Sequence, residues 1–265
     1  MLSDCGTRDW YVASIKAVIL SHAPGVHVVD ITHEVPPQDV MAGAFTLAAA
    51  APWFPPRTVF LGVVDPGVGS ARAIVAAQAD DRWFIGPDNG LLSLCFQRAK
   101  RLEAVQVTNR RYWLDPVSPT FHGRDIMAPV AAYLVRGGSL RQLGLPARRT
   151  ISLEVPTARR RSRTIDGRIV HVDAFGNLVT NVPGDWVSLR QHPRHRIMIR
   201  CAGRVARMVS SYAAVEAGQL VALIGSLGFV ELAVCNGSAT RVLNAARGDP
   251  VVVTWSSGAP MRRIE

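Results

Sequence analysis

The chain has 265 residues, enough for one large domain or two of medium size, each with its own hydrophobic core. Apolar residues make up 48% and charged residues 19%, a composition that excludes an intrinsically disordered chain. The longest apolar stretch, residues 40–54, contains Gly43 and Pro52 and is too short to span a bilayer. Because no signal-peptide pattern opens the chain, we expect a cytoplasmic protein without a membrane partner.

The net charge of +10 comes almost entirely from arginine. The arginines concentrate in residues 148–149, 159–163 and 194–200, segments typical of linkers and loops. A basic chain can bind nucleic acid through its phosphates, but these clusters lack the interleaved aromatic residues on which bases stack. The sequence therefore favours a solvated arginine-rich surface, and nucleic acid is not an expected partner.

The four cysteines, Cys5, Cys95, Cys201 and Cys235, lie far apart and form no C-x-x-C pair. This spacing argues against a structural zinc site and against a disulfide framework. We expect free, buried thiols.

The first half of the chain alternates helix and strand signals. Apolar residues recur at helical spacing from Tyr11 to Ile19 and again after Asp39, and a third helix is expected from His122 to Leu134. Short apolar runs predict strands at residues 26–29, 59–64, 74–76 and 83–85. This rhythm predicts an N-terminal α/β domain over residues 1–150, with a mostly parallel sheet flanked by helices.

The second half reads differently. Residues 151–164 are rich in arginine, proline, serine and threonine with little periodicity, and we predict a linker there. Beyond it, helical periodicity is nearly absent and short strand signals recur at 167–173, 196–201, 220–224, 229–234 and 251–255. Residues 165–265 are therefore expected to form a smaller C-terminal β-barrel-like domain.

Asp65 is the first candidate for chemistry, because it follows a buried strand and ligands collect at the carboxyl ends of such strands. The glycine-containing loop after it returns Arg72 towards the aspartate. The loop lacks the lysine and the Ser/Thr of a nucleotide-triphosphate loop, which makes a phosphate cradle a weak interpretation. A tight turn with a structural Asp–Arg salt bridge explains the same residues.

His122 is the second candidate, since it precedes a glycine and the start of the third predicted helix. It is suited to acid–base work or ligand binding, although a structural role is equally compatible with the sequence. Asp65 and His122 are also possible metal ligands, but no third ligand stands at helical spacing, and no metal is expected.

Further polar residues follow other predicted strands and turns. Asp4 is suited to bidentate recognition of ribose hydroxyls, whereas Asp9 is suited to capping a helix. Asn177 carries the donor and acceptor that can meet the edge of adenine, and a simple turn over residues 173–177 explains it as well. Segments 225–231 and 235–238 show the same mixture of glycine and polar residues.

Taken together and in order, seven segments resemble the S-adenosyl-L-methionine (SAM) hydroxide adenosyltransferase family, which is related to fluorinase and chlorinase enzymes. They are residues 3–9, 30–35, 64–72, 86–90, 120–125, 173–181 and 225–231. The family's first strand is longer, whereas only Met1 and Leu2 precede Ser3 here; either the first strand is truncated, or the start of the chain is misassigned.

The resemblance implies a homotrimer with sites between neighbouring subunits, and cleavage of SAM by water at the ribose 5′ carbon, without a cofactor. It implies that Asp65, Arg72 and His122 activate the water and that Asp4 holds the ribose hydroxyls. The other implied roles are adenine recognition by Asn177 and the backbone near Val234 and Asn236, stacking by Phe175 and Tyr212, and binding of the methionine end by Asp9, Asp173, Ser226 and Glu231.

Two other functions remain open. One is a chlorinase-like transfer of the adenosyl group to halide, and the other is a non-catalytic adenosine- or SAM-binding module. The first is disfavoured by Asp65, because two like charges about 4 Å apart repel by roughly 4 kcal/mol at an effective dielectric constant of 20.

Overall fold

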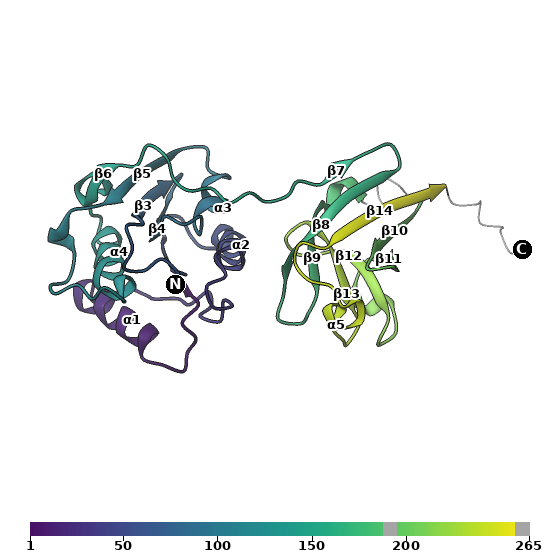
Figure 1. The fold of residues 1–265 in the computed structure, drawn as a ribbon, viewed down its shortest axis with the longest axis horizontal. Coiled ribbons are helices and arrows are strands. Elements are labelled where there is room, and N and C mark those ends of the chain that lie inside the picture. Colours follow the sequence, from purple (N-terminus) through teal and green to yellow (C-terminus); the bar gives the residue numbers. More distant parts are fainter. Residues whose placement is uncertain (188–194, 258–265) are drawn as a thin grey trace, which may run out of the picture. The chain divides into compact units, whose positions relative to one another are not determined.

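The computed structural model describes residues 1–187 and 195–257, and Arg194 of the predicted arginine cluster lies outside them. The chain forms two compact units, Met1–Leu153 and Glu154–Glu265, each with its own core (Figure 1). The division between the units falls inside the segment 151–164.

The first unit is built on a six-stranded sheet. Its order is β1 (Leu2–Ser3), β2 (Val59–Val63), β4 (Arg82–Pro87), β3 (Ile74–Ala79), β5 (Leu102–Val107) and β6 (Gly144–Pro146). The α/β class is confirmed, but the sheet is mixed instead of mostly parallel: β1, β2 and β4 run parallel, and the remaining pairings are antiparallel. The cause is local, because only Asp80 and Asp81 connect β3 to β4, and a two-residue connection joins antiparallel strands.

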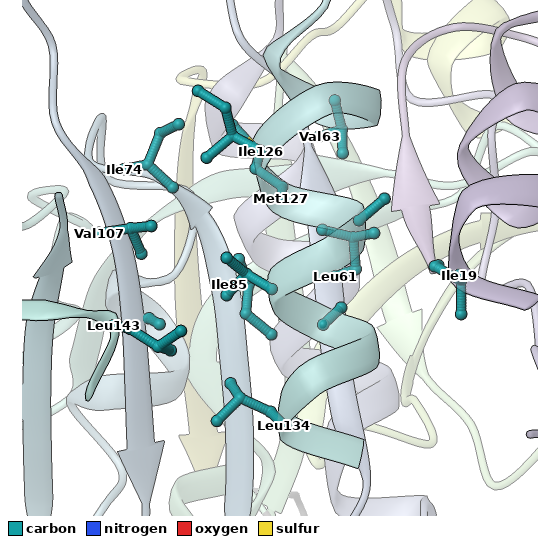
Figure 2. Packing of buried hydrophobic residues seen from close by; sticks show 14 of the residues in the cluster. Ile19, Leu61, Val63, Ile74, Ile85, Val107, Ile126, Met127, Leu134 and Leu143 are labelled. Atoms are coloured by element: carbon teal, nitrogen blue, oxygen red, sulfur yellow. The ribbon is translucent and has the colours of Figure 1, made fainter. Parts of the chain in front are cut away.

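Helices cover both faces of this sheet, so the unit has three layers. On one face, α1 (Tyr11–His22) and α4 (Ala128–Val135) pack over Leu61 and Ile85 (Figure 2). The neighbouring strand residues Phe60 and Phe84 point to the opposite face, because side chains alternate along a strand. There they pack with α2 (Val40–Ala50) and α3 (Ser93–Phe96).

The predicted strand at residues 26–29 is wrong. The segment runs beside β1, where the Met1 amino group donates to Val29 O at 2.6 Å and Ile31 N donates to Met1 O at 2.7 Å. It forms no ladder beyond a single bridge between Leu2 and Thr32, because β1 is only two residues long.

The second unit is a closed seven-stranded barrel, which confirms the predicted class. Around the ring run β8 (Thr164–Val172), β9 (Leu178–Pro183), β13 (Phe229–Val234), β12 (Leu220–Ile224), β11 (Arg204–Met208), β10 (His195–Cys201) and β14 (Pro250–Ser257), and β14 closes the ring on β8. The short β7 (Arg159–Arg160) pairs with β8 outside the ring, and α5 (Ala239–Leu243) follows β13. Inward-facing Ile169, Leu178 and Leu232 contribute to the core.

Within residues 1–187 and 195–257, no helix has the length and apolar character needed to cross a bilayer.

Candidate active site

Asp65 and Arg72 form a two-point ion pair just beyond the end of β2. Arg72 Nε donates to Asp65 Oδ1 at 2.7 Å, and Arg72 Nη2 donates to Asp65 Oδ2. Both side chains are largely buried, with 7% of the Asp65 side chain and 10% of the Arg72 side chain exposed. A paired guanidinium of this kind fixes the position of the carboxylate and balances its charge away from bulk water.

His122 joins this pair from a different part of the chain. Its Nδ1 lies 3.0 Å from Arg72 Nη2. Because a guanidinium can only donate, Nδ1 is the acceptor and the proton of the neutral ring sits on Nε2. Burial lowers the pKa of His122, and the positive charge of Arg72 lowers it further against the opposing effect of Asp65. The ring is therefore a neutral hydrogen-bond donor at physiological pH.

Two close backbone approaches bring these side chains together. Gly123 opens a π-helical turn, Gly123–Met127, directly after His122, and a Cβ there would lie 2.8 Å from Val63 Cγ1 of β2. Gly69, at φ +78°, lies so close to the segment before His122 that a Cβ would be 2.6 Å from Pro119 O. Both contacts need glycine: the first places the 120–125 segment against β2, and the second places the 65–72 loop against Pro119, which precedes that segment.

Asp125 stabilises the conformation of the same segment. Its side chain is 1% exposed, accepts from Ser118 N at 2.8 Å, and pairs with Arg124. These donors lower the pKa of Asp125 despite its burial. The buried carboxylate holds the turn that presents His122.

Asp4 leaves the same edge of the sheet as Asp65, because β1 and β2 are parallel and Ser3 pairs with Val63. The Asp4 carboxylate is half-buried, and its Oδ2 accepts from Gln38 N at 2.8 Å. Gln38 has φ +64°, a left-handed conformation that few non-glycine residues adopt. Asp9 is exposed, and Trp10 instead of Asp9 holds the N-cap position of α1.

A cavity of about 750 Å³ opens beside two of the three catalytic candidates. Arg72 and His122 lie in its wall together with Arg110, Trp113 and Asp115, whereas Asp4, Asp9 and Asp65 do not line it. The size is that of a pocket for a small organic molecule. In the described part of the chain, no three His, Cys, Asp or Glu side chains gather in a metal-binding arrangement.

In the second unit, Asp173 organises the turn between β8 and β9. Its Oδ1 accepts from Phe175 N at 2.9 Å and from Asn177 N at 2.8 Å, and its Oδ2 accepts from Asn177 Nδ2 at 2.9 Å. The Asn177 amide is thus held within the turn, with one of its donors already engaged, while Phe175 projects outward, 78% exposed. The simple turn expected over residues 173–177 is therefore present.

Tyr212 and Glu231 form a second polar pair. The Tyr212 hydroxyl donates to Glu231 Oε1 at 2.6 Å, and Glu231 is only 8% exposed. Burial raises the pKa of Glu231, the hydrogen bond from Tyr212 lowers it, and the charge of Asp173 raises it. Gly225 lies against this carboxylate, since a Cβ there would be 2.5 Å from Glu231 Oε2, and exposed Ser226 follows it.

Val234 and Asn236 lie where β13 ends. Val234 is buried, and its carbonyl accepts from Gly237 N at 3.0 Å, while Asn236 is exposed with φ +53°. The turn at 173–177 reaches this region, because Thr240 N donates to Gly176 O at 2.9 Å.

One supporting residue, Asn89, lies in the tripeptide Asp88-Asn89-Gly90, whose composition is typical of a simple turn. Asn89 Nδ2 donates to Val64 O at 2.9 Å, and Asn89 Oδ1 accepts from Leu91 N, so this side chain holds the backbone next to Asp65. The Asp-Asn-Gly tripeptide was the available signal, but a turn motif does not reveal which carbonyl its amide will find.

These features define a two-unit protein that couples an α/β sheet bearing a carboxylate–arginine–imidazole set to a closed β-barrel. The N-terminal domain of the SAM hydroxide adenosyltransferase family matches residues 1–144, and the C-terminal domain of that family matches residues 167–252. The chain belongs to this family.

Individual relatives agree with that membership. The chain is 39% identical over 259 residues to a protein named (R)-S-adenosyl-L-methionine hydrolase from Salinispora tropica, covering 95% of each chain. More distant is a protein named fluorinase from an Actinoplanes species, 31% identical over 212 residues, with 68% of this chain and 70% of that protein covered. The crystal structure of an uncharacterized conserved protein from Thermotoga maritima is similar with a TM-score of 0.89 at 34% identity, covering 96% of this chain and 98% of that one.

Proposed function

We propose that this protein hydrolyses SAM at the ribose 5′ carbon, giving adenosine and L-methionine. The observation that carries the proposal is the largely buried Asp65–Arg72 pair in contact with His122, with Arg72 and His122 in the wall of a cavity of small-molecule size. Family membership supports it, as does the name of the Salinispora tropica relative.

The substrate already contains a good leaving group, because a sulfonium departs as a neutral thioether. The oxygen of water attacks C5′, the C5′–S bond breaks with its electron pair going to sulfur, and the attacking water loses a proton. Asp65 is the acceptor for that proton, since the Nδ1 lone pair of His122 is engaged by Arg72 and its Nε2 already carries a hydrogen.

Arg72 and His122 orient the reacting groups. Arg72 holds the Asp65 carboxylate in one position, and the Nε2–H of His122 is available to hold the water oxygen in line with the C–S bond. No cofactor takes part in this scheme. Rate acceleration comes from positioning the water and from keeping bulk solvent away.

The remaining residues are proposed to bind the substrate. Asp4 takes the ribose hydroxyls, and Asn177, with backbone groups near Val234 and Asn236, takes adenine. Phe175 and Tyr212 are available for stacking. The proposed contacts to the methionine end are Asp9, Asp173, Ser226 and Glu231. We further propose that the protein is cytoplasmic. We also propose that it is a homotrimer, and the molar mass from light scattering of the purified protein tests this directly.

In the deciding experiment, SAM is incubated with the purified protein in H₂¹⁸O, in halide-free buffer and in high chloride. The products are separated by chromatography and their masses are measured. We expect adenosine labelled with ¹⁸O at the 5′ oxygen, with methionine unlabelled, in both buffers. Formation of 5′-chloro-5′-deoxyadenosine would identify the chlorinase-like alternative instead. Tight adenosine binding without cleavage over hours would indicate a binding module and would reject the proposal.

A further inference from the structure

A network of polar side chains, buried at Ser3 and His33, lies beneath the turn that carries Asp4, and the proposed reaction does not use it. Ser3 is 0% exposed and His33 is 3% exposed, and Ser3 Oγ lies 2.7 Å from His33 Nδ1. On the other side of the ring, His33 Nε2 lies 3.0 Å from Asp30 Oδ1. This side-chain network ends at the surface, where Lys16 Nζ donates to Asp30 Oδ2 at 2.5 Å.

The donors and acceptors of this network follow one order, from Ser3 through His33 to the Asp30 carboxylate. Partial burial of Asp30 is outweighed by the hydrogen bond from Lys16 and by the interaction with His33, so the pKa of Asp30 is lowered and the carboxylate is ionised. The carboxylate favours the ring proton on His33 Nε2, although the N–H direction is poor and the attraction is chiefly electrostatic. His33 Nδ1 is then the acceptor, and the Ser3 hydroxyl donates to it.

Because the Ser3 hydroxyl donates its hydrogen to His33, its oxygen can accept a further hydrogen bond, and Cys5 N donates to it at 3.3 Å. The backbone follows the same path: Ser3 N donates to Thr32 O at 3.0 Å, and Gly6 N donates to His33 O at 2.7 Å. The turn from Ser3 to Gly6 is therefore fastened at its start, middle and end. Asp4 lies inside this turn.

A serine, a histidine and an aspartate in line also suggest a nucleophile, but burial excludes that role here. The Ser3 side chain has no exposed surface through which a substrate could approach. What the network does control is the geometry of its neighbour in sequence, because a turn held at three points leaves its carboxylate few orientations.

We propose that His33 is a positioning residue for nucleoside recognition: acting through Ser3, it fixes the turn that aims the Asp4 carboxylate at the two ribose hydroxyls. This inference rests on the proposed function insofar as Asp4 binds the ribose, but it requires only that a nucleoside binds, and no cleavage. Loss of the imidazole leaves the sheet intact and lets the turn relax.

The test compares the affinity of the full-length protein for adenosine with its affinity for 2′,3′-dideoxyadenosine by titration calorimetry. The variants are Ser3→Ala, His33→Phe and His33→Asn, and His27→Phe serves as the matched control because His27 is exposed on the same segment. We expect the wild type and the control to prefer adenosine by more than about tenfold, as hydrogen bonds to a charged group allow.

In Ser3→Ala and His33→Phe the preference should fall to below about threefold, through weaker adenosine binding alone. His33→Asn should retain more of it, because its Oδ1 can accept from Ser3 as Nδ1 does. Ser3→Ala removes a single oxygen and keeps the test valid if His33→Phe does not fold.

An unchanged preference in Ser3→Ala, or in a folded His33→Phe, would overturn the inference. So would equal weakening of both nucleosides, which is the signature of a merely structural role, or a wild type without preference. SAM cleavage is measured separately: a wild type that binds adenosine with the expected preference but cleaves nothing rejects the proposed function and leaves this inference standing.

Discussion

Arg72 Nη2 donates a hydrogen bond to His122 Nδ1 across 3.0 Å, and this contact decides which nitrogen of the imidazole can act. Only the Nε2 position faces away from the guanidinium with a proton to donate. Replacement by glutamine, whose amide nitrogen reaches as far as Nε2, should therefore preserve more activity than replacement by asparagine, whose amide ends near Nδ1.

We expect kcat of His122→Gln to exceed that of His122→Asn by about tenfold, the order of one oriented hydrogen bond. Steady-state kinetics on both variants, with thermal melting to check the fold, makes the comparison. A faster asparagine variant would show that the imidazole acts through Nδ1 and that the tautomer assignment is wrong, and equal rates would show that the Nε2 hydrogen bond contributes nothing to kcat.

The pH dependence follows from the same contact. Burial and the charge of Arg72 lower the pKa of His122 below the ordinary imidazole value of about 6.5. Since the neutral ring is the active form, kcat should stay constant as the pH falls through 6.5 and decline only below it. Folding stability should drop in the same direction, because between the two pKa values the unfolded chain binds more protons than the folded one.

Replacing Arg72 by glutamine removes the second cause of the lowered pKa. The acid limb of the pH–rate profile should then move to higher pH, on top of the overall loss of rate. An acid limb at or above pH 6.5 in the wild type would contradict the assigned environment of His122.

Asp65→Asn tests the proton acceptor directly. Asparagine can still accept from Arg72, so the loop should remain folded, but it cannot take a proton from water. We expect kcat to fall by at least about 100-fold, the usual contribution of a general base, with little change in the affinity for SAM. Asp81→Asn is the matched control, since it removes a carboxylate from an ion pair with Arg82 near the surface. Near-wild-type turnover by Asp65→Asn would end the proposed mechanism.

Parts of the sequence determine structure locally, and these parts could be predicted. The apolar β-branched run of β2 has one conformation open to it in a covered sheet, and Asp65 and Arg72 are joined by a loop too short to separate them. His122 lies 50 residues from Arg72 along the chain. Its place in the site came with the family resemblance, since no local pattern encodes so distant a contact.

The features that were missed depend on tertiary contacts. His33 lies in a polar segment typical of a loop, yet it is buried and in contact with Ser3 of β1. The direction of β3 was also not predicted from its apolar run, because orientation depends on the two-residue connection at Asp80–Asp81. Run length identifies a strand, whereas connections and partners decide its direction and its burial.

Tyr212→Phe tests the polar pair of the barrel. Removing the hydroxyl deletes a hydrogen bond to a buried carboxylate, and without that donor the pKa of Glu231 rises further, so that Glu231 protonates at higher pH. We expect KM for SAM to rise by about tenfold with kcat nearly unchanged, and the increase to grow as the pH falls. Tyr133→Phe, which removes a hydroxyl bonded to Gln142, controls for general loss of a tyrosine hydroxyl. A KM independent of pH in both variants would remove Glu231 from substrate binding.

The contact between Gly69 and Pro119 offers a final test, because it joins the loop that ends at Arg72 to the segment that leads to His122. Gly69→Ala combines two effects. The left-handed φ of +78° costs an alanine about 1–2 kcal/mol, and the new Cβ would lie 2.6 Å from Pro119 O, so that the backbones must separate. Separation lengthens the Arg72–His122 hydrogen bond.

Gly137→Ala isolates the first effect, since Gly137 has φ +87° and no atom within 4 Å of its Cβ position. Both variants should therefore melt at lower temperature, by a similar amount from backbone strain, while only Gly69→Ala should lose activity, by about tenfold or more if the 3.0 Å contact is broken. If the two variants keep the same activity at a temperature where both are folded, the close approach at Pro119 does not hold the catalytic set together.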